Sequence, residues 1–253
     1  MQPLAKLPAR QLLVGRPEGL PFAELLTNVK SGPLIAMYLR LFRRFGITPK
    51  GVIHLGAHVG EEALPYLLMG YRRALFVEPD PTCYEALVTN LAYVEKVARG
   101  MDAFCGLADG GQWCQARRVA VGDREGETEL FVQPNDRESS ILPPTTTAPA
   151  RTLTVPLTTL DTLLEELPEG WQREDLNVLY ANIQGAELIA LRGARATLRH
   201  IDFAYIEINL VSRYEGDPTV DQVVDFMDGE GFERVWGHEG LVPDVGYLVF
   251  VRR

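Results

Sequence analysis

The stretch GVIHLGAHVGEEALPYLLMGYRRALFVEPD, residues 51–80, decides the fold of this chain. Its apolar run VIHL at 52–55 predicts a short strand that is buried on both faces. The small residues of GAHVG at 56–60 follow directly and predict a tight turn. The buried strand is therefore followed by a turn whose small side chains would let a ligand approach the backbone.

The second half of the same stretch predicts a helix and then another strand. The helix is expected to start near Glu61, because Pro65 is tolerated only close to the first turn of a helix. The apolar run ALFV at 74–77 predicts the next strand, and Glu78 follows its last residue. The whole stretch is a β-turn-α-β unit with a carboxylate at the tip of its second strand.

This unit has the chemistry of a nucleoside-binding site. A glycine turn admits a ligand close to the main chain, and the start of a helix suits a carboxylate or phosphate. Glu78 stands about 20 positions after Gly56, the spacing at which a carboxylate meets ribose hydroxyls. Gly56 and Gly60 do not form G-x-G-x-x-G, so S-adenosylmethionine is a better candidate than a dinucleotide. Ordinary α/β turns are the alternative interpretation.

Three stretches resemble the FkbM-type methyltransferases. VIHLGAHVGEE at 52–62 is similar to the family's apolar strand and GA-(N or H)-x-G turn, and FVEPDPTCYEALVTNL at 76–91 to its E-P-(D or N)-P strand end and following helix. LNVLYANIQGAELIALRGA at 176–194 resembles the family's D-(I or V)-Q-G-A-E-L-x-x-L-(K or R)-G-A segment. The resemblance covers roughly residues 50 to 235.

The resemblance implies a fold, an activity and a cofactor. The fold is α/β, with a Rossmann-like class I methyltransferase sheet that is mostly parallel, ends in antiparallel strands and carries helices on both faces. The activity is S-adenosylmethionine-dependent methyl transfer, expected to be O-methylation of a hydroxyl on a small molecule, natural product or sugar. The resemblance also implies the cofactor-binding residues, which are His54, Gly56, Ala57, His58, Gly60, Glu78, Pro79, Ala120, Val121 and Asn182. Ser139 and Ser140 are further candidates, or turn hydroxyls that cap their own backbone.

The catalytic candidates are Glu207, Asn182, His54 and Glu187. An alcohol acceptor must lose its proton as its oxygen attacks, and Glu207 is the preferred base. His54 lies inside a strand, where a core or cofactor-contacting role is expected. A divalent metal held by oxygen ligands near Asn182 and Glu207 is compatible with the residue types, but no ligand spacing requires one.

Asn182 departs from the family pattern, which usually has aspartate at this position. A neutral amide is a poor base, so the residue keeps a second function class open. That class is a non-catalytic or decayed cofactor-binding protein with a Rossmann-like fold. A nucleotide-dependent oxidoreductase is a third class, disfavoured because G-x-G-x-x-G is missing.

Length and patterning predict one large α/β domain in a chain of 253 residues. Residues 1–49 are expected to form an irregular and helical cap, and 50–253 the methyltransferase domain, with an insert at about 124–160. Further strands are expected at 117–121, 127–133, 152–157, 176–181, 203–208, 232–236 and 246–251, and helices at 22–29, 34–45, 81–98, 186–198 and from Asp217 to about 230.

Charge and cysteine usage restrict the partners and the compartment. The net charge is −9 and no basic stripe is visible, which argues against a nucleic-acid partner. The three cysteines, Cys83, Cys105 and Cys114, form no C-x-x-C pair and suggest reduced thiols in a cytoplasmic protein. No apolar run is long enough for a transmembrane helix or a signal peptide. The expected partner is a small-molecule hydroxyl acceptor, and the oligomeric state is not predicted.

Overall fold

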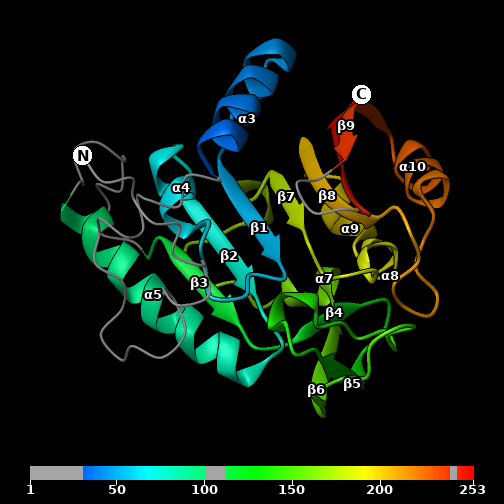
Figure 1. Cartoon of the computed structure of the whole chain (residues 1–253). Coiled ribbons are helices and arrows are strands. Elements are labelled where there is room, and N and C mark those ends of the chain that lie inside the picture. Colours follow the sequence, from blue (N-terminus) through cyan, green and yellow to red (C-terminus); the bar gives the residue numbers. More distant parts are fainter. Residues whose placement is uncertain (1–30, 101–111, 240–243) are drawn as a thin grey trace, which may run out of the picture.

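A seven-stranded sheet with the strand order β3-β2-β1-β7-β8-β10-β9 forms the centre of the computed structural model, which describes residues 31–100, 112–239 and 244–253 (Figure 1). Its strands are β1 Gly51–Leu55, β2 Arg73–Val77, β3 Cys114–Arg117, β7 Val178–Ala181, β8 Phe203–Asn209, β9 Phe232–Glu239 and β10 Val245–Arg252. The first five of these strands in the sheet order run parallel, and β10 pairs antiparallel with both β8 and β9. The predicted fold class, including the antiparallel finish, is confirmed.

Helices cover both faces of this sheet. On one face lie α3 Ser31–Phe45, α4 Ala63–Leu68 and α5 Pro81–Gly100, and on the other α7 Leu160–Leu163, α8 Glu187–Arg192, α9 Arg195–Leu198 and α10 Val220–Gly229. Alternate residues of one strand face the two layers, so Val52 packs with the first group and Ile53 with the second. The two hydrophobic cores explain why the central strands contain apolar residues at nearly every position.

The helix predicted at 34–45 is present as α3. Its rings Tyr38 and Phe42 pack edge-on against Phe203 of β8, with centroids 5.7 and 4.9 Å from it. The short helix predicted at 22–29 lies outside the described residues. None of the helices in the described chain is long and apolar enough to cross a membrane.

A second sheet of three strands stands beside the carboxyl ends of the main sheet. It consists of β4 Ala120–Gly122, β5 Gly126–Val132 and β6 Arg151–Thr159, in the order β4-β6-β5. The prediction of one strand at 117–121 is therefore wrong. The chain leaves the main sheet after Arg117, and the segment from Ala120 onward pairs with β6 instead of β2. This switch places the residues of β4 over the strand ends.

The helix predicted at 186–198 is divided into α8 and α9 by Gly193. A Cβ atom at Gly193 would collide with the carbonyl oxygen of Gly122, so the glycine lets the helix terminus approach β4 closely. The next helix, predicted to start at Asp217, begins later, at Val220. Thr219 is the N-cap of α10, and its hydroxyl accepts from the Gln222 N–H at 3.3 Å.

Asp161 has a capping role that its position in α7 does not reveal. Its Oδ1 accepts from Thr197 N and Oγ1, both at 2.7 Å, and its Oδ2 accepts from Ala196 N at 2.9 Å. The residue thus satisfies the free N–H groups at the start of α9, 35 positions away in sequence.

Replacing Asp161 by alanine is expected to destabilise the protein by about 2 kcal/mol, because three donors lose a charged acceptor. Urea unfolding measures the loss. Asp225, an exposed acidic residue of α10, is the control, and its replacement by alanine should change stability by less than about 0.5 kcal/mol. Equal stability of the two variants would show that Asp161 does not act as a cap.

Candidate functional site

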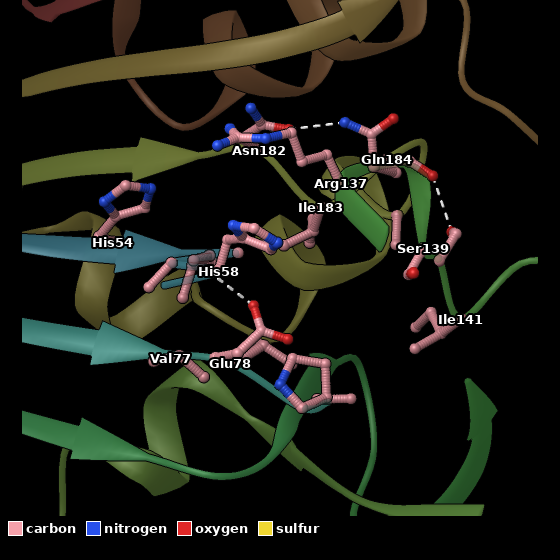
Figure 2. Close-up of a pocket in the computed structure, with 18 of the residues that line it drawn as sticks. His54, His58, Val77, Glu78, Arg137, Ser139, Ile141, Asn182, Ile183 and Gln184 are labelled. Carbon is pink, nitrogen blue, oxygen red and sulfur yellow. Dashed lines mark hydrogen bonds between the residues drawn. The ribbon is translucent and has the colours of Figure 1, made fainter. Parts of the chain in front are cut away.

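A pocket opens beyond the carboxyl ends of β1, β2 and β7 and encloses about 830 Å³, its open mouth included (Figure 2). In open α/β sheets ligands bind at this edge. The turn after β1, the end of β2, β4, the segment at 135–142 and the end of β7 all contribute to its wall. We call the 135–142 segment, which contains the short helix Asp136–Glu138, the strap.

The turn after β1 forms the base of the pocket. The N–H groups of Gly56 and Ala57 both donate to the Val77 carbonyl at 3.0 Å, and Asn182 N donates to the Leu55 carbonyl at 3.0 Å. Gly56 has a φ of +77°, and a Cβ atom there would collide with the Asn182 carbonyl oxygen. The three strand ends are therefore held tightly together, and only glycine fits at this position.

Glu78 presents a buried carboxylate at the end of β2. Its Oε2 accepts from His58 N at 2.8 Å (Figure 2), and its Oε1 accepts from Asp80 N at 2.9 Å. Burial raises the pKa of this carboxyl group to about 8, although the two backbone N–H groups favour the ionised form. Each carboxylate oxygen keeps a free lone pair, so the group can accept hydrogen bonds from ligand hydroxyls.

The strap crosses the pocket and is fixed on both sides. His58 Nε2 lies 3.2 Å from Asp136 Oδ1, and Arg137 forms an ion pair with Glu61. On the opposite side Ser140 Oγ donates to the Gln184 carbonyl at 2.7 Å. Side chains from the strap thus connect the turn after β1 with the end of β7.

The end of β7 holds an amide network. Gln184, with a φ of +56°, donates through Nε2 to Asn182 Oδ1 at 2.8 Å and to Glu207 Oε1 at 2.6 Å. Asn182 and Gln184 line the pocket, whereas Glu207 lies behind Gln184. Burial raises the pKa of Glu207 above its ordinary value. Glu207 therefore orients the Gln184 side chain.

Glu187 and His54 are both held by local contacts. The Glu187 carboxylate accepts from Ile183 N at 2.8 Å and Gly185 N at 2.9 Å, and burial raises its pKa to about 8. His54 Nδ1 lies 3.2 Å from the Tyr66 hydroxyl, and burial lowers the pKa of its ring to about 3. His54 lines the pocket as a neutral side chain, and Glu187 does not reach its wall.

Most of the residues predicted for the site line this one pocket. They are His54, Gly56, Ala57, His58, Glu78, Pro79, Ala120, Val121 and Asn182, together with Ser139 and Ser140. Three predicted residues, Gly60, Glu187 and Glu207, are not part of its wall. Sequence reasoning did not name Glu61, Glu62, Arg137, Tyr180 and Gln184 as site residues, and of these only Arg137 stands outside the stretches that resemble the family.

Within the described part of the chain, one group of metal-binding residue types converges. The ligand atoms of His58, Cys83 and Asp136 lie within 4.8 Å of one another. His58 and Asp136 also belong to the pocket wall, and burial raises the pKa of the Cys83 thiol. Asn182 and Glu207, considered as oxygen ligands from the sequence, do not belong to this group.

Comparison with known proteins gives one family and several distant structures. A family model described as the methyltransferase FkbM domain matches residues 54–234. No curated protein matches the chain. A methyltransferase FkbM from Methylobacillus flagellatus KT is 15% identical with a TM-score of 0.49, over 80% of this chain and 43% of its own. This chain thus spans less than half of that protein.

Two other structures align over most of both chains. The magnesium protoporphyrin IX methyltransferase of Synechocystis PCC 6803, solved with bound SAH, is 8% identical with a TM-score of 0.48, over 96% of this chain and 92% of its own. A putative RNA methyltransferase from Pyrococcus horikoshii is 13% identical with a TM-score of 0.45, over 87% and 85%.

Proposed function

Because the chain belongs to the FkbM methyltransferase family, we propose that it transfers a methyl group from S-adenosylmethionine to a hydroxyl oxygen of a small molecule. The observation that carries this proposal is the buried Glu78 carboxylate, which two backbone N–H groups hold at the edge of the pocket. A carboxylate at this strand end suits the two hydroxyls of a ribose. A nucleotide-dependent oxidoreductase is disfavoured, because the turn after β1 is not the G-x-G-x-x-G turn that binds the phosphates of a dinucleotide.

The pocket residues fit an adenosyl ligand. Ala120 and Val121 of β4 give an apolar wall beside Glu78, suited to an adenine ring. Gly56 brings the main chain to the pocket floor, between the ends of β2 and β7. Since neighbouring strands lie about 4.8 Å apart, Glu78, Gly56 and Asn182 follow one another along the edge over about 10 Å. A ligand anchored at Glu78 would extend past Gly56 toward Asn182.

In this proposal the chain mainly aligns two reactants and excludes water. Bound S-adenosylmethionine would supply a methyl group activated on a sulfonium. The strap covers the pocket, which limits competing attack by solvent. Glu207 is the proposed proton acceptor for the attacking hydroxyl. This role requires the Gln184 side chain to turn aside when the acceptor binds, because Nε2 now lies 2.6 Å from Glu207 Oε1.

Calorimetric titration with S-adenosylhomocysteine, S-adenosylmethionine and NADH tests the proposal. We expect binding of the two sulfur nucleosides and none of NADH. Once the cofactor is established, transfer of a labelled methyl group to hydroxylated small molecules tests the O-methylation. Folded protein that binds neither sulfur nucleoside would exclude a methyltransferase function.

A non-catalytic cofactor-binding protein is the second candidate, because Asn182 replaces the aspartate usual in the family. The variant Asn182→Asp should fold, since its Oδ1 can still accept from Gln184 Nε2. The added negative charge should favour the sulfonium cation, so we expect S-adenosylmethionine to gain about 3- to 10-fold in affinity relative to S-adenosylhomocysteine. Titration of both ligands measures this ratio. An unchanged ratio would show that Asn182 lies away from the sulfur, and a gain of transfer activity would support a decayed wild-type enzyme.

A further inference from the structure

We propose that Glu62 and Arg137 bind the amino-acid end of the ligand, with the Glu62 carboxylate on the α-ammonium group and the Arg137 guanidinium on the α-carboxylate. The inference rests on the proposed function, because it assumes an adenosyl ligand anchored at Glu78. It assigns a role to two residues that are not among the site residues predicted from the sequence. It also predicts which analogues the pocket distinguishes.

Acidic groups occupy two separate parts of the pocket. Glu78 feels the charges of Asp80 and Asp136, on the side of β2. Glu61 and Glu62 also line the pocket, where Glu61 pairs with Arg137. One acidic part therefore suits the ribose hydroxyls, and the other is free for a second group of the same ligand.

Glu62 faces the β7 side of the pocket. Burial raises the pKa values of Tyr180, of β7, and Tyr247, of β10, and the charge of Glu62 adds to both shifts. A ligand that extends from Glu78 past Gly56 toward the end of β7 would bring its far end to this region. The distal group of the proposed ligand is an amino acid, which carries an ammonium and a carboxylate.

Glu62 lacks a cationic partner of its own. In the described ranges no arginine, lysine or histidine lies within ion-pair distance of its carboxylate, and the side chain does not cap α4. Burial and the neighbouring Glu61 raise its pKa to about 7. A partly buried carboxylate without a cation is costly, and a ligand ammonium would offset that cost.

Arg137 supplies the complementary charge. It extends from the strap into the pocket on the side of Asn182, away from Glu78 (Figure 2). Its ion pair with Glu61 leaves other donors of the guanidinium free, because the group has five N–H bonds. Arginine binds carboxylates through two parallel hydrogen bonds, so Arg137 can hold a ligand carboxylate while it keeps Glu61.

This arrangement replaces the helix terminus as the expected site for the ligand carboxylate. Helix α4 has only six residues, and its N-cap is Glu62. The negative charges of Glu61 and Glu62 would repel a carboxylate approaching the helix alone. With Arg137 present, the group carries both signs and matches an amino-acid zwitterion.

The test compares S-adenosylhomocysteine with 5′-methylthioadenosine, which keeps the adenosine and the thioether but has no amino acid. We expect Glu62→Gln and Arg137→Gln each to weaken binding of S-adenosylhomocysteine by about 10- to 100-fold. Binding of 5′-methylthioadenosine should be unchanged. The exposed residues Glu85 and Arg118, replaced by glutamine, are the matched controls and should bind both ligands as wild type does.

Proton release gives a second readout that a purely structural role would not change. Pairing with an ammonium lowers the pKa of Glu62 from about 7, so binding of S-adenosylhomocysteine at pH 7 should release protons. The calorimetric enthalpy then depends on the ionisation enthalpy of the buffer. Glu62→Gln should remove this part of the release, and 5′-methylthioadenosine should not cause it.

Equal losses for both ligands in these variants, or no loss for S-adenosylhomocysteine, would overturn the inference. So would unchanged proton release in Glu62→Gln. Each of these results is distinct from failure of the proposed function, in which folded wild-type protein binds neither ligand.

Discussion

Replacing Glu78 by alanine is expected to weaken binding of S-adenosylhomocysteine by more than about 100-fold, because two ribose hydroxyls lose a charged acceptor. The same change removes the acceptor of His58 N and Asp80 N, so the turn after β1 also loses its fixed position. Calorimetric titration measures the affinity. Glu85→Ala, on the exposed side of α5, is the control and should bind as wild type does.

The pH dependence of ligand affinity tests whether the charge of Glu78, and not only its size, contributes to binding. Its pKa of about 8 means that the carboxyl group is mostly protonated at pH 6 and mostly ionised at pH 9. Only the ionised form accepts from both hydroxyls, so affinity should rise with pH, by up to about 10-fold per unit below the pKa. 5′-Methylthioadenosine is the appropriate ligand, since it does not reach Glu62. Undiminished affinity in folded Glu78→Ala, or an affinity that is flat from pH 6 to 9, would contradict a ribose-binding role.

The second large effect is expected for Gly56→Ala, which should destabilise the protein by about 3 kcal/mol or more. The new Cβ atom would meet the Asn182 carbonyl oxygen, and the φ of +77° is itself unfavourable for alanine. Relief of this clash would separate β1 from β7 at the base of the pocket. Urea unfolding measures the loss, and ligand binding should disappear together with stability.

Gly70 provides the matched control, because it has a φ of +82° but, among the described residues other than its chain neighbours, no atom within 4 Å of the position that a Cβ would take. Gly70→Ala should therefore cost only the backbone strain, about 1 kcal/mol. Similar losses for the two variants would mean that the close approach at Gly56 contributes nothing beyond its backbone conformation.

The strand and helix pattern of the main sheet could be predicted, because short-range signals define it. Apolar runs such as 52–55 and 74–77 identify buried strands, and Asp80 followed by Pro81 marks the start of α5, where the structure shows Asp80 Oδ1 accepting from Thr82 N. Glu78 could be predicted as a site residue because it directly follows an apolar strand, and that position is visible in the local sequence. These features need no knowledge of distant contacts.

The errors arise where distant segments decide the local structure. The run at 117–121 is largely apolar, but its second half pairs with β6, which is about 35 residues further on. Gly193 interrupts a helical pattern because the backbone of β4 lies against it. Neither β6, as the partner of β4, nor β4, as the neighbour of Gly193, can be recognised from the sequence immediately around these positions.

Long-range contacts also explain why some site residues were not predicted from the sequence. Arg137 stands in the strap, whose sequence has no hydrophobic periodicity, and its partner Glu61 is 76 positions earlier in the chain. Glu207 was placed correctly on a strand end, but only the fold shows that Gln184 separates it from the pocket. Side-chain roles that depend on such long-range pairs become visible only when both segments are in place.

The strap has a consequence for the rate at which ligands exchange. Tyr214 donates through its hydroxyl to the Glu138 carbonyl at 2.6 Å, and Arg213 lies 3.0 Å from the Glu138 carboxylate. The Ser140 and Arg137 side chains add further contacts, and Ser140 also pairs with Phe131 of β5 through two backbone hydrogen bonds, so movement of the strap would have to break all of these contacts. Under the proposed function, release of the spent cofactor would require these contacts to break, and turnover could not exceed the rate at which they do.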